Sequence, residues 1–214
     1  MDDFGAETYW ASSEIGNDFW IAKGGAVGKM FGYRSAGRYE VSDFEGYDAA
    51  AKKWILKEGV VDASAVVGTL RPGMMKLADI DGSGDGKVTT ADREIIGDAN
   101  PVHTGGFSIN ARAYGFDLSA NFNWSVGNDV YNANKIEFTQ TSKYQYRNMI
   151  SEMADGKRWT NLNENGTICN DPEKLAAMNA NTTMWSPYTQ RMIFSDWAVE
   201  DASFLRLNTL TLGY

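Results

Sequence analysis

The chain has 214 residues and a formal net charge of −8 at pH 7. Its sequence has no clustered lysine and arginine, which argues against a nucleic-acid-binding protein, and no run of about 18 apolar residues, which excludes a helical membrane protein. Aromatic residues make up 13% of the chain and the mean hydropathy is −0.39. These values still allow a membrane β-barrel, because barrel strands alternate apolar and polar residues.

The two ends of the chain and the segments next to them show weaker patterns. The first five residues lack the charged and apolar segments of a signal peptide. A strand is predicted at residues 27–40, and a helix at residues 48–57, which are rich in alanine and lysine. Residues 203–214 are strand-like and stop within the pattern. Both ends predict that residues 1–214 are a fragment of a longer chain.

The clearest pattern lies in the middle of the chain. Residues 104–113 and 116–126 each alternate apolar with polar side chains, and Tyr114 and Gly115 interrupt the alternation between them. Period-two alternation on both sides of a tight turn predicts a β-hairpin. The second strand has the length of about 9 to 11 residues that a tilted strand needs to cross a membrane.

Such a hairpin fits either a soluble β-sandwich or a membrane barrel, since both have one apolar and one polar face. Two further features favour the barrel. The polar residues of the hairpin are mostly asparagine and serine, which suits a hydrated lumen. The short turn also lies between long segments at 41–103 and 127–195. Outer-membrane barrels alternate short turns with long loops, whereas compact soluble domains rarely contain loops of that length.

One short helix is predicted inside the second long segment, at residues 172–178. Asp171 precedes it as an N-cap and Pro172 occupies its first position, and both residue types are favoured there. The long segments also contain aromatic side chains that could stack on sugar rings or anchor a partner, or could pack within the loops. They are Tyr144, Tyr146, Trp159, Trp185 and Tyr188.

Residue types that carry catalysis are scarce. Cys169 and His103 are the single cysteine and the single histidine. Neither a disulfide framework, a Ser–His–Asp triad nor a histidine-rich metal site can therefore be assembled within the chain. The carboxylates of the long segments show no spacing that singles out a glycosidase pair. The sequence predicts that the protein is not an enzyme, and it indicates no substrate-binding residue.

An Asp- and Gly-rich segment at residues 79–92 fits the spacing of a twelve-position calcium loop. Gly86 stands at position six, where the sharp turn requires glycine, and Val88 stands at the apolar position eight. The candidate oxygen ligands are Asp81, Ser83, Asp85, Lys87 through its backbone carbonyl, Thr89 and Asp92. Calcium prefers six to eight oxygen ligands, and this spacing turns oxygens toward one point.

The fit to a calcium loop is incomplete. Position twelve is Asp92 and not glutamate, so the shorter side chain puts bidentate ligation in doubt. No pair of long helices is predicted beside the loop, which argues against a calcium sensor. Two interpretations stay open: a Ca²⁺ site with a structural role, and a tight Asp/Gly turn without a metal.

A series of short motifs runs through the chain in a fixed order. It comprises VGK at 27–29, FGY at 31–33, PG at 72–73, DR at 92–93, IIG at 95–97, NP at 100–101, TGGF at 104–107, GFDLS at 115–119, GNDVYN at 127–132, VEDASFLRL at 199–207 and LTLGY at 210–214. The series resembles the C-terminal β-barrel region of the SusC/RagA family of TonB-linked (TonB-dependent) outer-membrane transporters of Bacteroidetes. The resemblance covers residues 27–214.

The resemblance implies an all-β fold, a partial antiparallel transmembrane β-barrel with long extracellular loops that contain short helices. It also implies a place in the cell outer membrane, in contact with its lipid, and nutrient import of a glycan or peptide. A SusD-like surface lipoprotein and TonB are the implied partners, and TonB grips a part of the parent protein that this sequence lacks. The fragment alone is not expected to be transport-competent, and the family has no catalytic residues to carry over.

The resemblance also orients the chain. With the turn at 114–115 on the periplasmic side, the loops at 41–103 and 127–195 are extracellular, and the calcium-type loop lies where substrate arrives. The alternative function is a secreted β-sandwich binding module that contains the calcium loop. Such a module would fold alone and stay soluble without detergent, whereas an isolated barrel segment would expose open sheet edges and aggregate.

Overall fold

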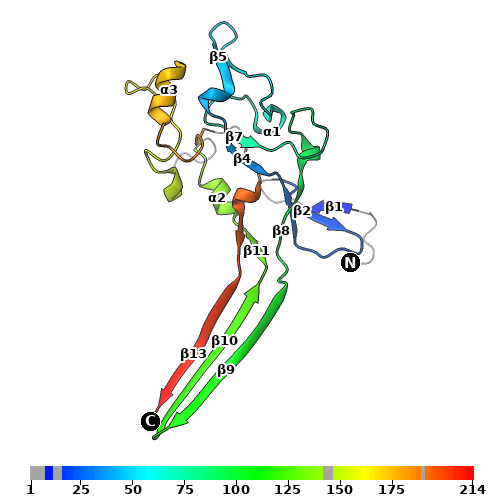
Figure 1. Ribbon diagram of the computed structural model, residues 1–214, viewed down its shortest axis with the longest axis vertical. Helices are drawn as coiled ribbons and strands as arrows, with labels where there is room; N and C mark the ends of the chain where they lie inside the picture. The colour runs from blue at the N-terminus through cyan, green and yellow to red at the C-terminus, as the bar shows by residue number, and fades with distance from the viewer. Residues whose placement is uncertain (1–7, 12–15, 142–146, 189–190) are drawn as a thin grey trace.

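The computed structural model describes residues 8–11, 16–141, 147–188 and 191–214. Figure 1 shows a long three-stranded sheet that reaches away from a larger body of short strands, short helices and loops. We call these two regions the extended sheet, formed by β9, β10 and β13, and the loop body, formed by the other described residues. The strands pair antiparallel in every sheet and the helices are short, as predicted.

The extended sheet has the strand order β13–β10–β9. Its strands are β9 (His103–Ala113), β10 (Phe116–Val126) and β13 (Phe204–Gly213). Tyr114 and Gly115 join β9 to β10 with positive φ angles of 52° and 86°, the left-handed conformation that a two-residue type I′ turn requires. All three strands begin and end within one residue of the predicted bounds.

The pairing of β10 with β13 contains one irregularity. Asn121 faces Thr209 and Phe122 faces Leu207, so Asn208 is an extra residue on β13. This arrangement is a β-bulge, in which two residues of one strand oppose one residue of its neighbour. The sequence pattern did not predict it.

The single strand predicted at residues 27–40 is wrong. The structure has two short strands there, β3 (Lys29–Gly32) and β4 (Ser35–Arg38), which belong to different sheets. Between them, Tyr33 leaves the first sheet and its N–H donates to the carbonyl of Phe194 at 3.1 Å. Gly32 allows this approach, because a Cβ there would lie 2.8 Å from the same carbonyl oxygen.

The helix predicted at residues 48–57 is also wrong. The segment forms a hairpin of β5 (Phe44–Asp48) and β6 (Lys53–Leu56). The Oδ1 of Asp48 accepts hydrogen bonds from the N–H groups of Ala50 and Ala51, which closes the turn. Trp54 then packs edge-on against Phe44, with ring centroids 5.7 Å apart. Burial of these rings outweighs the weak helix propensity of the segment.

The remaining strands and helices are short and belong to the loop body. The strands are β1 (Thr8–Ala11), β2 (Phe19–Ala22), β7 (Met75–Leu77), β8 (Glu94–Asp98), β11 (Asp129–Tyr131) and β12 (Val199–Asp201). The α-helices are α1 (Ser64–Val67), α2 (Ala133–Glu137) and α3 (Pro172–Asn179). Short 3₁₀ turns cover Val41–Asp43, Thr90–Asp92, Ser151–Met153 and Asp196–Ala198. Among the described residues, no helix is long and apolar enough to cross a membrane.

Helix α3 is the short helix predicted at residues 172–178. Asp171 caps it, since its Oδ1 accepts from the N–H groups of Glu173 and Lys174 at 3.0 and 3.2 Å. These two N–H groups would otherwise have no partner in the first helical turn. The sequence therefore identified both the helix and its cap correctly.

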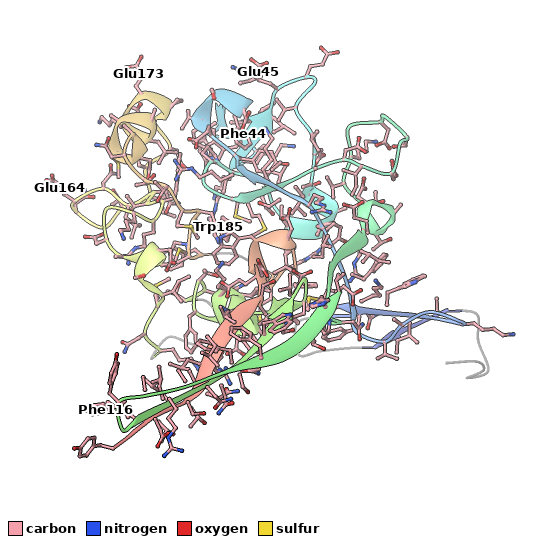
Figure 2. The ribbon with its side chains drawn as sticks, turned by 60° about the horizontal axis from the view of Figure 1, so that its bottom comes forward. Phe44, Glu45, Phe116, Glu164, Glu173 and Trp185 are labelled. Atoms are coloured by element: carbon pink, nitrogen blue, oxygen red, sulfur yellow. The ribbon has the colours of Figure 1, made fainter. Side chains whose placement is uncertain are left out.

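The apolar core lies in the loop body, in three clusters. The largest gathers Tyr33, Tyr39, Phe44, Ala63, Val67, Leu70, Met74, Met75, Leu77, Val88, Met153, Met184 and Trp185. A second gathers Met30, Ile96, Ile136, Phe194 and Ala198, and a third Trp159, Cys169 and Leu175. The extended sheet contributes only Ala120 to the buried apolar residues among those described. Figure 2 shows Phe44 and Trp185 inside the loop body and Phe116 at the far end of the sheet.

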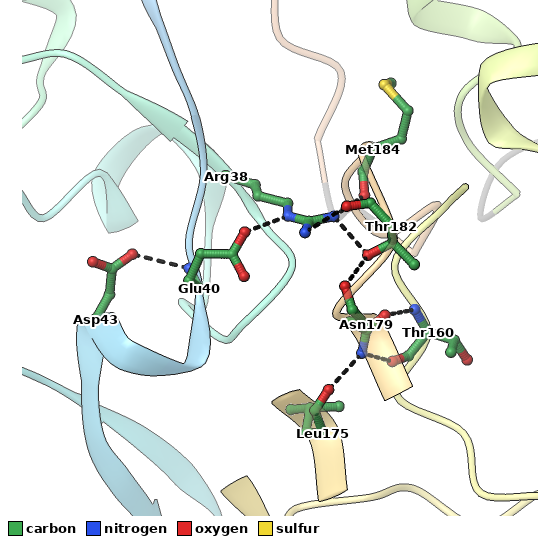
Figure 3. A network of polar contacts seen from close by, with 8 residues as sticks. All are labelled: Arg38, Glu40, Asp43, Thr160, Leu175, Asn179, Thr182 and Met184. Atoms are coloured by element: carbon green, nitrogen blue, oxygen red, sulfur yellow. Dashed lines mark hydrogen bonds and ion pairs between the residues drawn. The ribbon is translucent and has the colours of Figure 1, made fainter. Parts of the chain in front are cut away.

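A polar network joins the segment 157–186 to β4 (Figure 3). The guanidinium of Arg38 donates to the carbonyls of Thr182 and Met184 at 2.9 and 2.8 Å, and it lies 4.7 Å from the ring centre of Trp159. The side chain of Asn179 bonds both the N–H and the carbonyl of Thr160. The loops of this part of the body are therefore fixed by specific contacts.

Candidate functional site

The extended sheet has one face that is apolar except for His103 at the end next to the loop body, and this face is the first candidate site. The residues that share it by register are His103, Gly105, Phe107, Ile109, Ala111 and Ala113 of β9, Phe116, Leu118, Ala120, Phe122, Trp124 and Val126 of β10, and Leu205, Leu207, Leu210 and Leu212 of β13. Many of these side chains are exposed, and Leu212 keeps 72% of its surface accessible. An exposed apolar surface of this size marks contact with a membrane or another protein.

The opposite face of the extended sheet is polar. Its residues are Thr104, Gly106, Ser108, Asn110, Arg112, Asp117, Ser119, Asn121, Asn123, Ser125, Phe204, Arg206, Thr209, Thr211 and Gly213. Hydrogen bonds link neighbours across the strands, as from Ser108 Oγ to Asn121 Oδ1 at 2.6 Å and from Ser119 Oγ to Asn110 Oδ1 at 2.8 Å. The two faces of the sheet therefore differ sharply in polarity.

Aromatic rings lie at both ends of the apolar face. At the turn end, the rings of Phe116 and Tyr214 are 4.9 Å apart. At the end next to the loop body, Trp124 stacks on His103 and its Nε1 donates to His103 Nδ1 at 2.7 Å. Gly105 leaves room for that indole, because a Cβ there would lie 2.2 Å from it. Paired aromatic belts of this kind mark the two interfaces of a membrane.

The length of the extended sheet suits a membrane crossing. Strands β9 and β10 have 11 residues each. At about 3.3 Å per residue they span roughly 35 Å, and a tilt of about 45° reduces this to roughly 25 Å, the height of the apolar band of an outer-membrane barrel. Within the described residues, no strand pairs with the outer edge of β9 or of β13.

The calcium-type loop is the second candidate site. It brings together carboxylate oxygens of Asp79, Asp81 and Asp92, which all lie within 4.8 Å of one another. Asp81 and Asp92 are predicted ligands, whereas Asp79 precedes the twelve-position count and was missed. Its only sequence signal is its place two residues before Asp81. The carboxylate of Asp85 is not part of this group; it accepts from the N–H of Lys87 at 2.9 Å.

The other predicted ligands make local hydrogen bonds. Ser83 Oγ accepts from the N–H of Asp85 at 3.4 Å, and Thr89 Oγ1 accepts from the N–H of Ala91 at 3.1 Å. Lys87 forms an isolated parallel bridge with Asp62. Next to it, Val88 is fully buried in the largest core cluster, so the apolar residue at position eight anchors the loop to the body.

Asp92 closes the loop from inside. Its side chain is fully buried, and its two oxygens accept from the N–H groups of Ile80, Asp81 and Thr89 at 2.8, 3.1 and 2.7 Å. Burial alone would raise the pKa of Asp92, but these backbone hydrogen bonds outweigh it and lower the pKa below its ordinary value. Asp92 therefore stays ionised, as a metal ligand must, and its hydrogen bonds also hold the loop together.

Asp79 has the opposite tendency. Burial, together with the negative charges of Asp92, Asp81 and Asp85, raises the pKa of Asp79 above its ordinary value, although the N–H of Gly86 opposes this. Carboxylates that repel one another in this way gain from a bound cation, which makes the donor set suitable for a hard cation such as Ca²⁺.

Most of the predicted aromatic loop residues that the structure describes lie inside the body. Trp159 and Trp185 are 2% and 6% exposed and belong to core clusters, so these two pack within the loops. Tyr188 is half exposed. Tyr144 and Tyr146 lie outside the described residues.

Comparison with known proteins connects this geometry to transporters. No protein-family model matches the chain. TonB-dependent receptor P3 of Formosa agariphila is 28% identical over 194 residues, which cover 91% of the chain and 16% of that protein. The solved RagAB peptide importer in its closed-closed state aligns with a TM-score of 0.55 and 19% identity, covering 98% of the chain. A second structure of the RagAB peptide transporter gives 0.55 and 20% identity over 97%.

The chain is similar in sequence to a segment of a TonB-dependent receptor and shares its fold with a segment of the RagAB transporter. The resemblance predicted from the motif series is therefore confirmed, and so is the antiparallel β fold. The segment spans 16% of the receptor from Formosa agariphila and 18% of the solved RagAB chains. The names of these relatives describe transport and reception, and none describes an enzyme.

Proposed function

We propose that the chain forms part of the wall and the outer loops of an outer-membrane importer that TonB energises. The observation that carries this proposal is the apolar face of the extended sheet, which has an aromatic ring at each end and a polar face behind it. Lipid would cover the apolar face and water would fill the lumen on the other side. The loop body would lie outside the cell, at the end of the sheet opposite the turn.

The cargo and the partner belong to the same proposal. The solved relative is a peptide importer, and we extend its class of cargo to a glycan or peptide for this chain. A SusD-like lipoprotein would cover the loop body from outside, and a part of the transporter beyond this segment would engage TonB. The extended sheet alone would not transport, and no residue would have a catalytic role.

Two neighbouring residues of β9 test the membrane assignment. Ile109 is on the apolar face and half exposed, whereas Ser108 is on the polar face at nearly the same depth. An arginine at the midplane of the lipid face costs about 2–4 kcal/mol. We therefore expect Ile109→Arg in the intact transporter to reduce the folded, heat-modifiable protein in outer-membrane fractions severely, and Ser108→Arg to leave it nearly unchanged.

The behaviour of the protein without detergent separates the proposal from the alternative, because both interpretations bury Ile109 and expose Ser108. In a secreted β-sandwich module, the apolar face would pack on a second sheet and the protein would be a folded monomer without detergent. Equal tolerance of both arginines, or a monodisperse detergent-free monomer, would contradict the importer.

We also propose that the loop at 79–92 binds Ca²⁺ for structural support. The cluster of Asp79, Asp81 and Asp92 supports this, because its carboxylate oxygens lie close enough to share one ion. We expect calcium to raise the thermal midpoint of the intact protein, and Asp81→Asn to abolish the rise. Asp85→Asn would abolish it only if the twelve-position geometry forms; a rise that survives both substitutions would refute the site.

A further inference from the structure

A cleft of about 240 Å³ opens in the loop body, away from both sites described above. Three segments that are distant in the sequence enclose it: the β5–β6 hairpin, the loop at 69–74 and the segment at 161–175. Its lining residues are Tyr47, Lys52, Lys53, Trp54, Thr69, Leu70, Arg71, Pro72, Met74, Asn161, Ile168, Cys169, Asn170 and Leu175. The volume is just below the range for drug-sized ligands and suits one residue or one sugar ring.

The charge of the cleft contrasts with that of the chain. The whole chain carries −8, yet the described residues that line the cleft include three cationic ones, Lys52, Lys53 and Arg71, and no aspartate or glutamate. Figure 2 shows two glutamates of the enclosing segment at 161–175, Glu164 and Glu173, pointing outward from the body. The cleft is therefore a cationic site on an acidic protein, which attracts anions.

Among the described residues, none of these three cations forms an ion pair. Asp48 faces Lys53 in the hairpin register, but its Oδ1 accepts from Ala50 and Ala51 in the turn.

Arg71 is the best placed of the three to bind a ligand. It donates one hydrogen bond, to the carbonyl of Tyr188, and a guanidinium has five N–H donors, so most of its capacity remains available. Burial lowers the pKa of Arg71, which means that its charge is partly desolvated without a neighbouring anion. A desolvated guanidinium binds a carboxylate strongly and in a fixed, bidentate orientation.

The rest of the cleft can hold the flat or apolar part of a ligand beside such a charge. Trp54 and Tyr47 form one wall, with ring centroids 5.8 Å apart. Leu70, Met74 and Leu175 are buried core residues that also line the cleft. Aromatic walls next to a cation are suited to an aromatic side chain or a sugar ring.

We propose that this cleft binds the carboxylate of a small organic ligand, with Arg71 as the bidentate partner and Trp54 against the ligand's flat or apolar part. Lys52 and Lys53 at the rim add attraction that salt screens. The inference stands on the cleft itself and does not depend on the membrane assignment. The carboxylate can come from the end of a peptide or from an acidic sugar, and the test distinguishes the two.

Calorimetric titration of the intact, detergent-solubilised protein with two matched pairs of probes tests the proposal. The pairs are N-acetylphenylalanine against its amide, and glucuronate against glucose. We expect at least one acid to bind at least about tenfold more tightly than its uncharged partner, as the loss of a charge-assisted hydrogen bond predicts. Binding by only one acid assigns the ligand to peptides or to acidic sugars; binding by both supports a general carboxylate site.

Substitutions then place the ligand in this cleft. Arg71→Gln should weaken the acid by at least about tenfold, and Arg71→Lys less, because it keeps the charge but loses the planar fork. Lys57→Gln, an exposed lysine that follows β6 outside the cleft, is the matched control and should change nothing. Should Arg71→Gln not fold, the double variant Lys52→Gln and Lys53→Gln takes its place, with a smaller expected loss.

Three outcomes would overturn the proposal. The first is binding of neither acid. The second is equal binding of an acid and its uncharged partner. The third is undiminished binding of the acid by folded Arg71→Gln or, if that variant fails to fold, by the double lysine variant.

Discussion

The loop body and the extended sheet differ in where they place their apolar side chains. The body buries Trp159, Tyr39 and Leu77 almost completely and fixes its loops through side chains such as Arg38 and Asp92. The sheet leaves Leu210 and Leu212 exposed on one flat face. The body therefore has its apolar contacts within itself, whereas the apolar face of the sheet has no covering among the described residues.

The comparison predicts where substitutions will act. Changes in the body should alter local stability in any solvent, because the contacts that they remove are internal. Changes on the apolar face of the sheet should act through whatever covers that face. Changes on the polar face should alter stability very little.

The largest effect is expected for Asp92→Ala in the body. This change leaves three backbone N–H groups without their acceptor, and each such loss costs about 1–3 kcal/mol. We expect the free energy of local opening to fall by at least about 3 kcal/mol, measured by hydrogen exchange of the amides at residues 80–89. Asp85→Ala removes one exposed acceptor and should cost about 0.5 kcal/mol or less; similar costs for the two would refute the anchoring role of Asp92.

An intermediate effect is expected from acidification. A side-chain hydrogen bond from Lys29 lowers the pKa of Asp98, and backbone hydrogen bonds lower the pKa of Asp92, each below the ordinary value of an aspartate. Folded-state pKa values below the unfolded ones stabilise the fold above the unfolded pKa, and this stability is lost as the pH falls through the folded values. The thermal midpoint of the body should therefore begin to fall below about pH 4. In Lys29→Gln the decline should be shallower; an unchanged pH profile would show that Lys29 does not set the pKa of Asp98.

The smallest effect on stability is expected for a substitution on the polar face of the sheet. Arg112 and Asp117 form an ion pair at 3.1 Å, but their side chains are 80% and 57% exposed. Exposed pairs contribute about 0–1 kcal/mol, so Arg112→Ala should change the thermal midpoint of the intact protein very little. A loss as large as that for Asp92→Ala would mean that the two regions do not differ as described.

The same difference explains how much the sequence could predict. The hairpin at 104–126 follows from its own alternation, because one side of each strand faces one medium along its whole length. Residues 27–40 and 48–57 have no such constraint. The first segment bends where Phe194 approaches from a distant part of the chain. The second folds back on itself so that its own Trp54 packs on Phe44. Neither contact is visible in the periodicity of the sequence.

The candidate sites divide in the same way. The apolar face and the turn at Tyr114 and Gly115 could be predicted, since both are local. The cleft at Arg71 could not, because it depends on how distant segments fold together. Asp79 was missed for a different reason, since it precedes the twelve-position count of the calcium loop. Helix α3 is an instructive exception inside the body: Asp171 and Pro172 mark its start through local chemistry alone.

The bulge at Asn208 determines which face of the sheet each residue of β13 takes. Leu205 and Leu207 have odd numbers and Leu210 and Leu212 have even numbers, so a regular strand would send the two pairs to opposite faces. With Asn208 as the extra residue, both pairs face the same side as Phe122 and Leu118. A single residue thus keeps the leucines of both halves of the strand on the apolar face and the threonines on the polar face. Deletion of Asn208 would exchange the faces of half of β13 without changing any other side chain.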